Sequence, residues 1–206
     1  ALGPLVKSVE YDPLNTSAYF NLGRACHNAG MYKQALRYYN EAVKQNSSKT
    51  GIYLYIGQIY SRMGMYGKAL EAFDQAIENG NDSKEAWNSI GRAHSLLDNS
   101  TQAISAYRRA LSIDSAYADA RGNLALELLE KGKSEAARAE LEKVVEQNPN
   151  YGIARYQLGR LYYKLGRTDK AVRELVMAAE LLNEPKEALD LLKTIQEAKD
   201  RNETSE

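Results

Sequence analysis

The segment "YLYIGQIYSRMGMYGKALEAFDQA" (residues 53–76) decides the fold, because related segments occur four more times along the chain. The other copies are "YFNLGRACHNAGMYKQALRYYNEA" (19–42), "WNSIGRAHSLLDNSTQAISAYRRA" (87–110), "RGNLALELLEKGKSEAARAELEKV" (121–144) and "RYQLGRLYYKLGRTDKAVRELVMA" (155–178). Each copy begins 34 residues after the previous one, without a gap. A fixed period of this length is typical of an array of small helical units that stack on one another.

Small side chains recur at fixed positions of the repeat, which is numbered here so that Thr16 is position 1 of the first copy. Position 8 holds a glycine or alanine in every copy: Gly23, Gly57, Gly91, Ala125 and Gly159. Positions 20 and 27 are also small, whereas positions 4, 7, 11 and 24 carry larger residues. The spacing places each set on one face of a helix, so the pattern predicts two helices per repeat whose backbones approach closely at the small residues.

A third recurring feature marks the end of the first helix. Position 15 is occupied by Gly30, Gly64, Asp98, Gly132 and Gly166. Glycine adopts the left-handed conformation without steric cost, and aspartate tolerates it better than most residues do. We therefore expect the first helix of each repeat to end there in a tight turn.

These positions resemble those of the tetratricopeptide repeat family, in which each 34-residue unit is a helix–turn–helix. The resemblance implies an all-α, right-handed superhelical solenoid. It divides residues 16–185 into five repeats: 16–49, 50–83, 84–117, 118–151 and 152–185. Residues 186–206 read as a capping helix and tail, with Leu189, Leu192 and Ile195 packed on the last repeat. Residues 1–15 are either part of a preceding repeat or an N-terminal helix.

Composition excludes several classes of function. Lys and Arg total 27 against 27 Asp and Glu, so no net charge favours nucleic acid or an anionic membrane as the main partner. The sequence contains no run of about 18 apolar residues, so it predicts no membrane span. We expect a cytoplasmic protein. Family resemblance leaves open an exported bacterial lipoprotein that assists pilus or secretion assembly.

The only cysteine, Cys26, precedes His27, which raises the question of a reactive thiol or a metal site. Adjacent helix residues point about 100° apart, so His27 is poorly placed to act as a base for Cys26. Cys26 also occupies position 11, a packing position, and one cysteine with two histidines lacks the spacing of a zinc site. We predict a buried, inert thiol, no metal, no cofactor and no enzymatic activity.

The resemblance also implies where a partner would bind. In this family the first helices line the concave face, so positions 2, 5, 6, 9, 12 and 13 are expected to face a groove. The candidate binding residues at these positions are Phe20, Arg24, His27, Leu54, Tyr55, Gln58, Arg62, Asn88, Arg92, Asn123, Leu126, Tyr156, Arg160 and Tyr163. Position 9 carries arginine in alternate repeats, which predicts a peptide or protein segment with acidic or C-terminal carboxylate groups. The competing interpretation is that these arginines are solvated and paired locally.

Two further points concern the kind of partner. The clamp by which some family members hold acidic chaperone tails needs lysine at position 5 and asparagine at position 9. The second repeat has Leu54 and Gln58 there, so a co-chaperone of that type is not expected.

The leading hypothesis is a scaffold or adaptor. The alternatives are self-association through residues 1–15, or a regulatory domain of a larger protein. The fourth repeat, with Arg121 and Gly122, is the least regular and is either a joint or a place of close approach by a partner.

Overall fold

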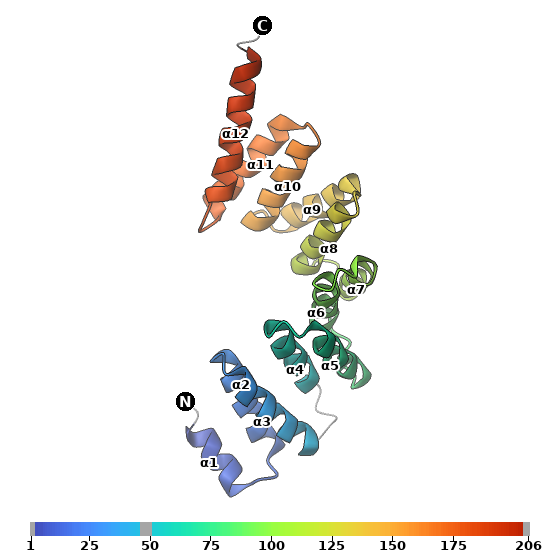
Figure 1. Ribbon diagram of the computed structural model, residues 1–206, viewed down its shortest axis with the longest axis vertical. Helices are drawn as coiled ribbons and strands as arrows, with labels where there is room; N and C mark the ends of the chain where they lie inside the picture. Colours follow the sequence, from blue (N-terminus) through green and yellow to red (C-terminus); the bar gives the residue numbers. More distant parts are fainter. Residues whose placement is uncertain (1–2, 46–50, 204–206) are drawn as a thin grey trace. The chain divides into compact units, whose positions relative to one another are not determined.

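The computed structural model describes residues 3–45 and 51–203, which form twelve α-helices and no strand (Figure 1). The first helices of the repeats are α2 (Thr16–Asn28), α4 (Ile52–Arg62), α6 (Lys84–Ser95), α8 (Ala118–Glu130) and α10 (Gly152–Lys164). The second helices are α3 (Tyr32–Gln45), α5 (Tyr66–Glu78), α7 (Ser100–Ile113), α9 (Ser134–Gln147) and α11 (Thr168–Leu181). Two more helices, α1 (Gly3–Tyr11) and α12 (Lys186–Glu203), flank these five pairs.

The two helices of each pair pack against each other at the small residues of position 8. A Cβ atom added to Gly57 would lie 2.4 Å from the ring of Phe73, and one added to Gly91 would lie 2.5 Å from the ring of Tyr107. Both distances are far below van der Waals contact, so only glycine fits between these rings and the first helix. The predicted close approach of the two helices is confirmed.

The predicted ends of the first helices are confirmed as well. Asp98 has φ of 59°, and the four glycines at the equivalent position have φ between 70° and 74°. The chain then reverses, and the next backbone amide bonds back to the first helix, as where Met65 N–H donates to the Tyr60 carbonyl at 2.9 Å. Asp98 is the only described non-glycine residue with positive φ.

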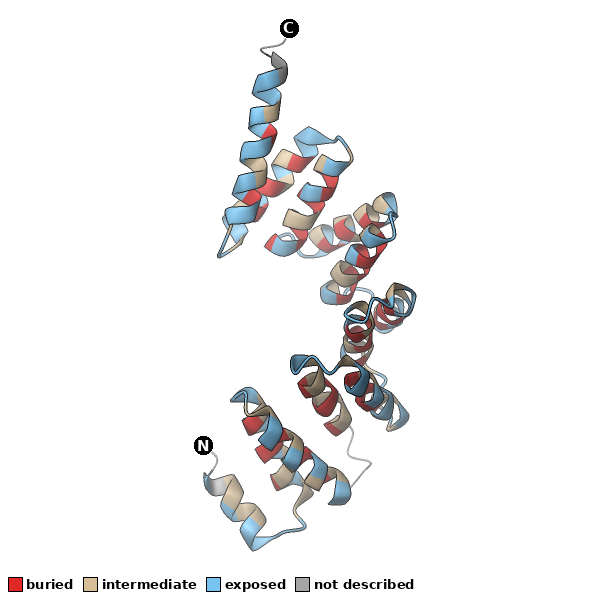
Figure 2. Ribbon diagram, viewed as in Figure 1, coloured by how far each residue is buried: buried red, intermediate tan, exposed pale blue. Residues whose placement is uncertain are grey.

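The chain divides into two compact units, residues 1–113 (unit 1) and residues 114–206 (unit 2). Unit 1 holds α1 to α7, and unit 2 holds α8 to α12. In both units the buried residues lie where paired helices face each other (Figure 2). At position 24, unit 1 buries the rings of Tyr39, Phe73 and Tyr107, whereas unit 2 buries Leu141 and Leu175.

Repeat position 4 shows a second difference between the units. Unit 1 has Tyr19, Tyr53 and Trp87 there, and unit 2 has two buried arginines. Arg155 donates from Nε to the Pro149 carbonyl at 2.6 Å and from Nη1 to Glu174 Oε2 at 2.7 Å. Arg121 bonds in the same way to the Ser115 carbonyl and to Glu140. Each arginine therefore joins its own second helix to the end of the preceding repeat.

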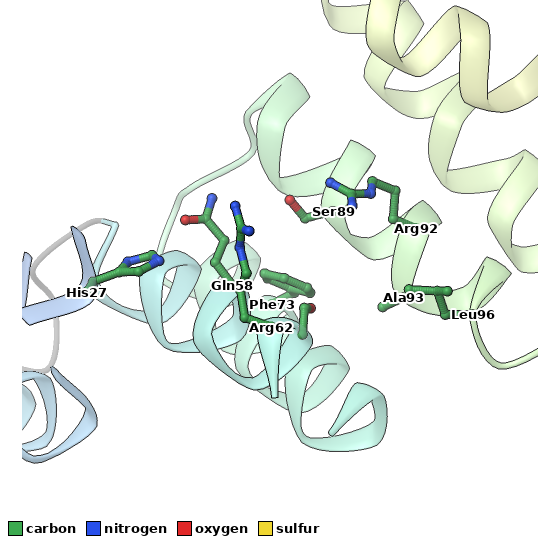
Figure 3. Close-up of a pocket in the computed structure, with 9 residues that line it drawn as sticks. His27, Gln58, Arg62, Phe73, Ser89, Arg92, Ala93 and Leu96 are labelled. Carbon is green, nitrogen blue, oxygen red and sulfur yellow. The ribbon is translucent and has the colours of Figure 1, made fainter. Parts of the chain in front are cut away.

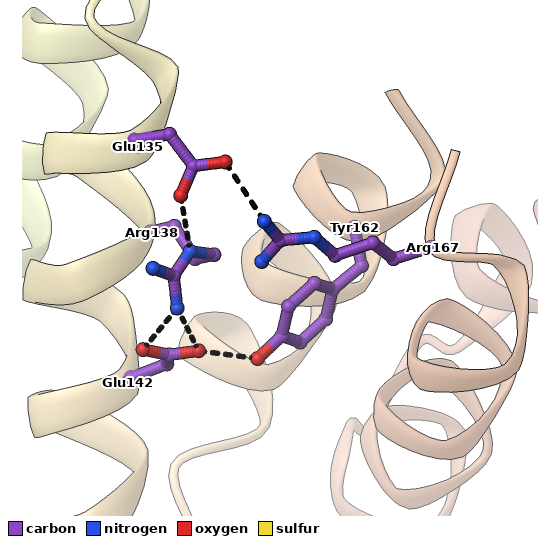
Figure 4. A network of polar contacts seen from close by, with 5 residues as sticks. All are labelled: Glu135, Arg138, Glu142, Tyr162 and Arg167. Atoms are coloured by element: carbon purple, nitrogen blue, oxygen red, sulfur yellow. Dashed lines mark hydrogen bonds and ion pairs between the residues drawn. The ribbon is translucent and has the colours of Figure 1, made fainter. Parts of the chain in front are cut away.

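A polar network joins α9 to the next repeat of unit 2 (Figure 4). Arg138 lies between Glu135, at 2.8 Å, and Glu142, at 2.5 Å. Arg167 binds the other oxygen of Glu135 at 3.0 Å, and the Tyr162 hydroxyl donates to Glu142. Burial and this bond to a carboxylate raise the pKa of Tyr162 to about 12. The network holds the turn before α11 and helix α10 against α9.

The helices at the two ends match part of what the sequence predicts. Helix α12 packs on α11, but its buried residues include Ala188 and Ile195, while Leu189 is 50% exposed. The prediction that Leu189 packs on the last repeat is therefore wrong, because the buried face passes through its neighbour Ala188. Helix α1 packs on α2. A helix in this place is consistent with both alternatives for residues 1–15, part of a preceding repeat or an N-terminal helix. Among the described residues, no helix is both long and apolar enough to cross a membrane.

Candidate binding site

Unit 1 contains a pocket of about 350 Å³ between its first helices. Helix α2 contributes His27, α4 and α6 contribute most of the wall, and Phe73 comes from α5 (Figure 3). The residues that line the pocket are His27, Gln58, Ser61, Arg62, Phe73, Ser89, Arg92, Ala93 and Leu96. The pocket is thus built by three consecutive repeats.

The pocket is rich in hydrogen-bond donors and positive charge. Arg62 on α4 and Arg92 on α6 are both exposed, and neither forms an ion pair within the described residues 3–45 and 51–203. No acidic side chain is among the described residues that line it. The Ser89 hydroxyl donates its hydrogen to the Glu85 carbonyl at 2.8 Å, so its oxygen can still accept a hydrogen bond. The arrangement can accept an anionic group.

The base of the pocket is apolar. In Figure 3 the polar ends of Gln58, Arg62 and Arg92 lie together on one side, and Phe73, Ala93 and Leu96 lie on the other. Phe73 and Ala93 are buried, whereas Leu96 is 54% exposed. An apolar side chain beside an anionic group would therefore find a complementary surface.

His27 closes the pocket on the side of α2. Its ring stands edge-on to Tyr32 and Tyr55, with 6.1 Å between ring centroids in both pairs. Its Nδ1 atom is buried and has no hydrogen-bond partner among the described residues. Burial, and then the positive charge of Arg62, lower the pKa of His27 below its usual value. The imidazole is consequently neutral near pH 7.

Four of the predicted binding residues meet in this pocket: His27, Gln58, Arg62 and Arg92. Phe20 and Tyr55 instead pack with each other at 5.7 Å and against the buried ring of Tyr39, and Leu54 is half-buried against the core. Their surface available to a partner is smaller than predicted, because neighbouring repeats cover part of it.

Two other predicted residues of unit 1 do not line the pocket. Arg24 is exposed on α2. Asn88 is only 7% exposed, which contradicts the expectation that its amide faces an open groove. Asn88 lies on the buried face of α6 and is engaged in an interaction of its own.

The remaining predicted residues belong to unit 2. Arg160 lies over the ring of Tyr156 at 5.5 Å and donates to Gln157 Oε1 at 3.2 Å. A hydrogen bond between Tyr156 and Glu187 links α10 to α12. Burial and then this bond raise the pKa of Tyr156. Leu126 is 40% exposed, and Asn123 and Tyr163 are half-buried. These side chains are in part engaged with their own unit.

Sequence reasoning missed four lining residues, namely Ser61, Phe73, Ala93 and Leu96, and it expected Ser89 to face the groove without naming it as a candidate binding residue. Ser61 and Ser89 occupy positions 12 and 6, which were expected to face the groove, so their place in the repeat was a usable signal. Phe73 fills a packing position, and its additional contribution to the pocket follows only from the three-dimensional arrangement.

The structure also answers the question about the cysteine. Cys26 is fully buried, its Sγ lies 3.9 Å from Gln34 Oε1, and burial raises the pKa of the thiol. The thiol therefore stays protonated near neutral pH, and the prediction of a buried thiol is confirmed. In the part of the chain that the structure describes, no group of three or more His, Cys, Asp or Glu side chains could hold a metal ion.

Comparison with known families agrees with this architecture. Models described as tetratricopeptide repeat match residues 16–49, 56–119, 98–150 and 128–181. The chain belongs to the tetratricopeptide repeat family, whose members are generally non-catalytic scaffolds for protein interaction. The predicted all-α helical repeat solenoid is confirmed.

Solved structures give the same result for the fold. YrrB, described as a TPR protein with an unusual peptide-binding site, is 23% identical over 94% of this chain and 100% of its own, with a TM-score of 0.73. A MamA structure is 28% identical over 81% of this chain and 96% of its own, with a TM-score of 0.71. PilF of Pseudomonas aeruginosa is 19% identical over 92% and 86%, with a TM-score of 0.81. The likenesses to YrrB and PilF show the fold alone. A search of curated proteins gave no match.

Proposed function

We propose that this protein is a non-catalytic scaffold or adaptor that binds an extended segment of another protein along its first helices. The observation that carries the proposal is the pocket of unit 1, where α2, α4 and α6 together present His27, Gln58, Arg62 and Arg92. A segment that crosses the pocket would contact three successive repeats. Binding would therefore depend on the stacked array rather than on any single repeat.

The chemistry of the pocket supports a peptide rather than a small-molecule substrate. A volume of about 350 Å³ lies at the lower end of the range for small-molecule sites, and the pocket is open to solvent and polar on one side. Gln58 offers both a donor and an acceptor, which suits a peptide group. Leu96, which is 54% exposed, offers contact for one apolar side chain.

The proposal is tested by photo-crosslinking at two exposed apolar residues of unit 1. A benzoylphenylalanine in place of Leu96 lies in the pocket, and one in place of Ile113 lies outside it as a matched control, with 54% and 42% of the native side chains exposed. We expect Leu96→benzoylphenylalanine to give an adduct with one defined segment of a partner, mapped by mass spectrometry, and the control to give none. The same adduct from both positions, or none from Leu96, would refute groove binding.

A second candidate function is self-association through the N-terminal end. Tyr11 is 93% exposed and Leu14 is 71% exposed, and these are the most exposed large apolar side chains among the described residues. Light scattering over a range of protein concentrations tests this candidate. If the wild type dimerises through this end, Tyr11→Ser/Leu14→Ser will be monomeric at the same concentrations. A monomeric wild type would remove the candidate.

Two further roles stay predictions. One is that of a regulatory domain within a larger protein, and the other is that of an exported lipoprotein of pilus or secretion assembly. The likeness to PilF at 19% identity concerns the fold and adds no argument for export.

A further inference from the structure

We propose that the pocket of unit 1 is a carboxylate subsite: it holds one carboxylate of an acidic segment between Arg62 and Arg92, and His27 gains a proton as that carboxylate binds. This inference rests on the proposed function and specifies the chemistry of the ligand. It concerns a carboxylate in general, whether from an Asp or Glu side chain or from the C-terminus of a protein.

The first argument is that two arginines without an ion pair line the same pocket. Other arginines are paired within the protein, as Arg155 is with Glu174 and Arg109 is with Asp82 at 2.7 Å. Arg62 and Arg92 have no carboxylate within the described residues, yet they line one pocket. A guanidinium binds a carboxylate through parallel charge-assisted hydrogen bonds, so the missing carboxylate fits as the ligand's group.

The second argument concerns the neighbours of the two arginines. Gln58 lies beside Arg62 on α4, and Ser89 precedes Arg92 by one turn of α6. Both can bond to the peptide groups that flank an acidic residue. Because the exposed side chain of Leu96 lies on the apolar side, the segment that fits best carries an apolar residue next to the acidic one.

The third argument concerns the charge on His27. The titratable groups that face its ring are Tyr32 on α3, Tyr55 and Arg62 on α4, and, across the pocket, Arg92 on α6. The charged ones are both cations, which favours a neutral imidazole in the empty pocket. A bound carboxylate would offset part of that positive charge and so make the imidazolium more favourable than it is in the empty pocket. Affinity should therefore increase as the pH falls from about 7.5 to about 5.5, by at most about tenfold per pH unit because one proton is taken up.

The experiment is a selection from a library of random peptides with free C-termini, carried out on the folded wild-type chain and on three variants. Arg62→Gln/Arg92→Gln removes both cations of the pocket. Arg108→Gln removes an exposed arginine of α7 outside it and serves as the matched control. His27→Asn removes the group that titrates. Circular dichroism confirms that each variant is folded.

We expect wild type and Arg108→Gln to select peptides with an acidic residue beside an apolar one, and Arg62→Gln/Arg92→Gln to lose at least about tenfold in affinity for them. Whatever its affinity at about pH 7.5, His27→Asn should show no gain at about pH 5.5, whereas the wild type should. Synthesis of the selected peptide as C-terminal acid and as amide then identifies which carboxylate is bound.

The remaining outcomes separate the two proposals. Selected peptides without acidic residues, or acidic peptides that bind the double variant equally well, would overturn the carboxylate subsite and leave groove binding intact if the Leu96 cross-link persists. A pH gain retained by His27→Asn would overturn the proton uptake. The absence of any selected peptide, together with no cross-link at Leu96, would overturn both proposals.

Discussion

The repeats of units 1 and 2 share one helix–turn–helix structure, but residues of different kinds fill the space between their two helices. In unit 1, aromatic residues occupy positions 4 and 24, and the rings of position 24 pack against glycine, as Tyr107 does against Gly91. In unit 2, leucines replace the rings of position 24, and buried Arg–Glu pairs replace those of position 4. Arg121 and Arg155 of unit 2 are therefore structural, whereas Arg62 and Arg92 of unit 1 form no ion pair within the described residues. The presence of an arginine is thus less informative than whether the protein supplies its counter-ion.

The largest expected effect comes from the buried ion pair of unit 2. Arg155→Met leaves Glu174 with its carboxylate only 16% exposed and without its partner, which should reduce the free energy of unfolding by about 3–5 kcal/mol. Arg155→Met/Glu174→Leu removes both charges and should recover most of this loss. Urea denaturation followed by circular dichroism measures both. If the double variant is no more stable than the single one, the difference between the units is not one of charge pairing.

The next effect concerns the glycine at position 8 of unit 1. Gly91→Ala places a Cβ atom 2.5 Å from the ring of Tyr107 and should cost about 1–3 kcal/mol of stability. Gly91→Ala/Tyr107→Leu copies the Ala125 and Leu141 pair of unit 2 and should recover part of it. The control is Gly67→Ala, where no atom lies within 4 Å and the helix should gain up to about 1 kcal/mol. Equal stability of the Gly91 and Gly67 variants in urea denaturation would contradict the close packing.

A smaller effect distinguishes the units by pH. Both histidines lie in unit 1, and burial lowers the pKa of His27 and of His94. Since the folded pKa lies below the unfolded one, the stabilisation is present above about pH 6.5 and is lost as the pH falls toward the folded pKa. Unit 1 should unfold at lower urea at about pH 5.5 than at about pH 7.5, as reported by fluorescence of the single tryptophan, Trp87.

The control for this pH effect is His27→Asn/His94→Asn, which should show a smaller difference between the two pH values. In unit 2, Glu142 is half-buried, which raises its pKa, but hydrogen bonds from Tyr162 and Arg138 outweigh this partial burial and lower it. Its stabilisation is therefore lost only at more acidic pH. An unfolding midpoint of the wild type that does not change between about pH 7.5 and 5.5 would argue against neutral, buried histidines.

The smallest expected effect is at the turn after the first helix. Asp98 in unit 1 has φ of 59°, where unit 2 has Gly132 with φ of 73°. Asp98→Gly should stabilise unit 1 by about 0.5–1 kcal/mol, and Gly132→Asp should destabilise unit 2 by a similar amount. Thermal unfolding of both variants checks the pair. A change of the same sign in both would show that the turn residue does not decide the difference.

The helical array could be predicted from the sequence because its determinants are local and recur every 34 residues. Glycine at position 15 and small residues at position 8 each have one physical reason, which holds in every repeat. Arg121 in contrast looked like an irregularity. Its meaning depends on Glu140, 19 residues later, and the same spacing between Arg155 and Glu174 was the available signal.

The candidate site could be predicted only in part, because it combines different positions of neighbouring repeats. Arg62 is at position 13 and Arg92 at position 9, so a search along one position grouped Arg92 with Arg24 and Arg160 instead. Burial was the second obstacle. Whether Asn88 faces solvent or Leu189 faces the core depends on small rotations of a helix against its neighbours, which the repeat pattern does not determine.

The bonds of Arg155 have a consequence for protein engineering. Its acceptors are a glutamate of its own repeat and the carbonyl at position 32 of the repeat before it, and Arg121 has the same two kinds of acceptor. A single repeat of unit 2 therefore carries both halves of this junction, the arginine with its glutamate at the start and the position of the acceptor carbonyl near the end. Arrays of designed length could be made by repeating residues 152–185 between residue 151 and α12, with each junction closed by the same buried guanidinium.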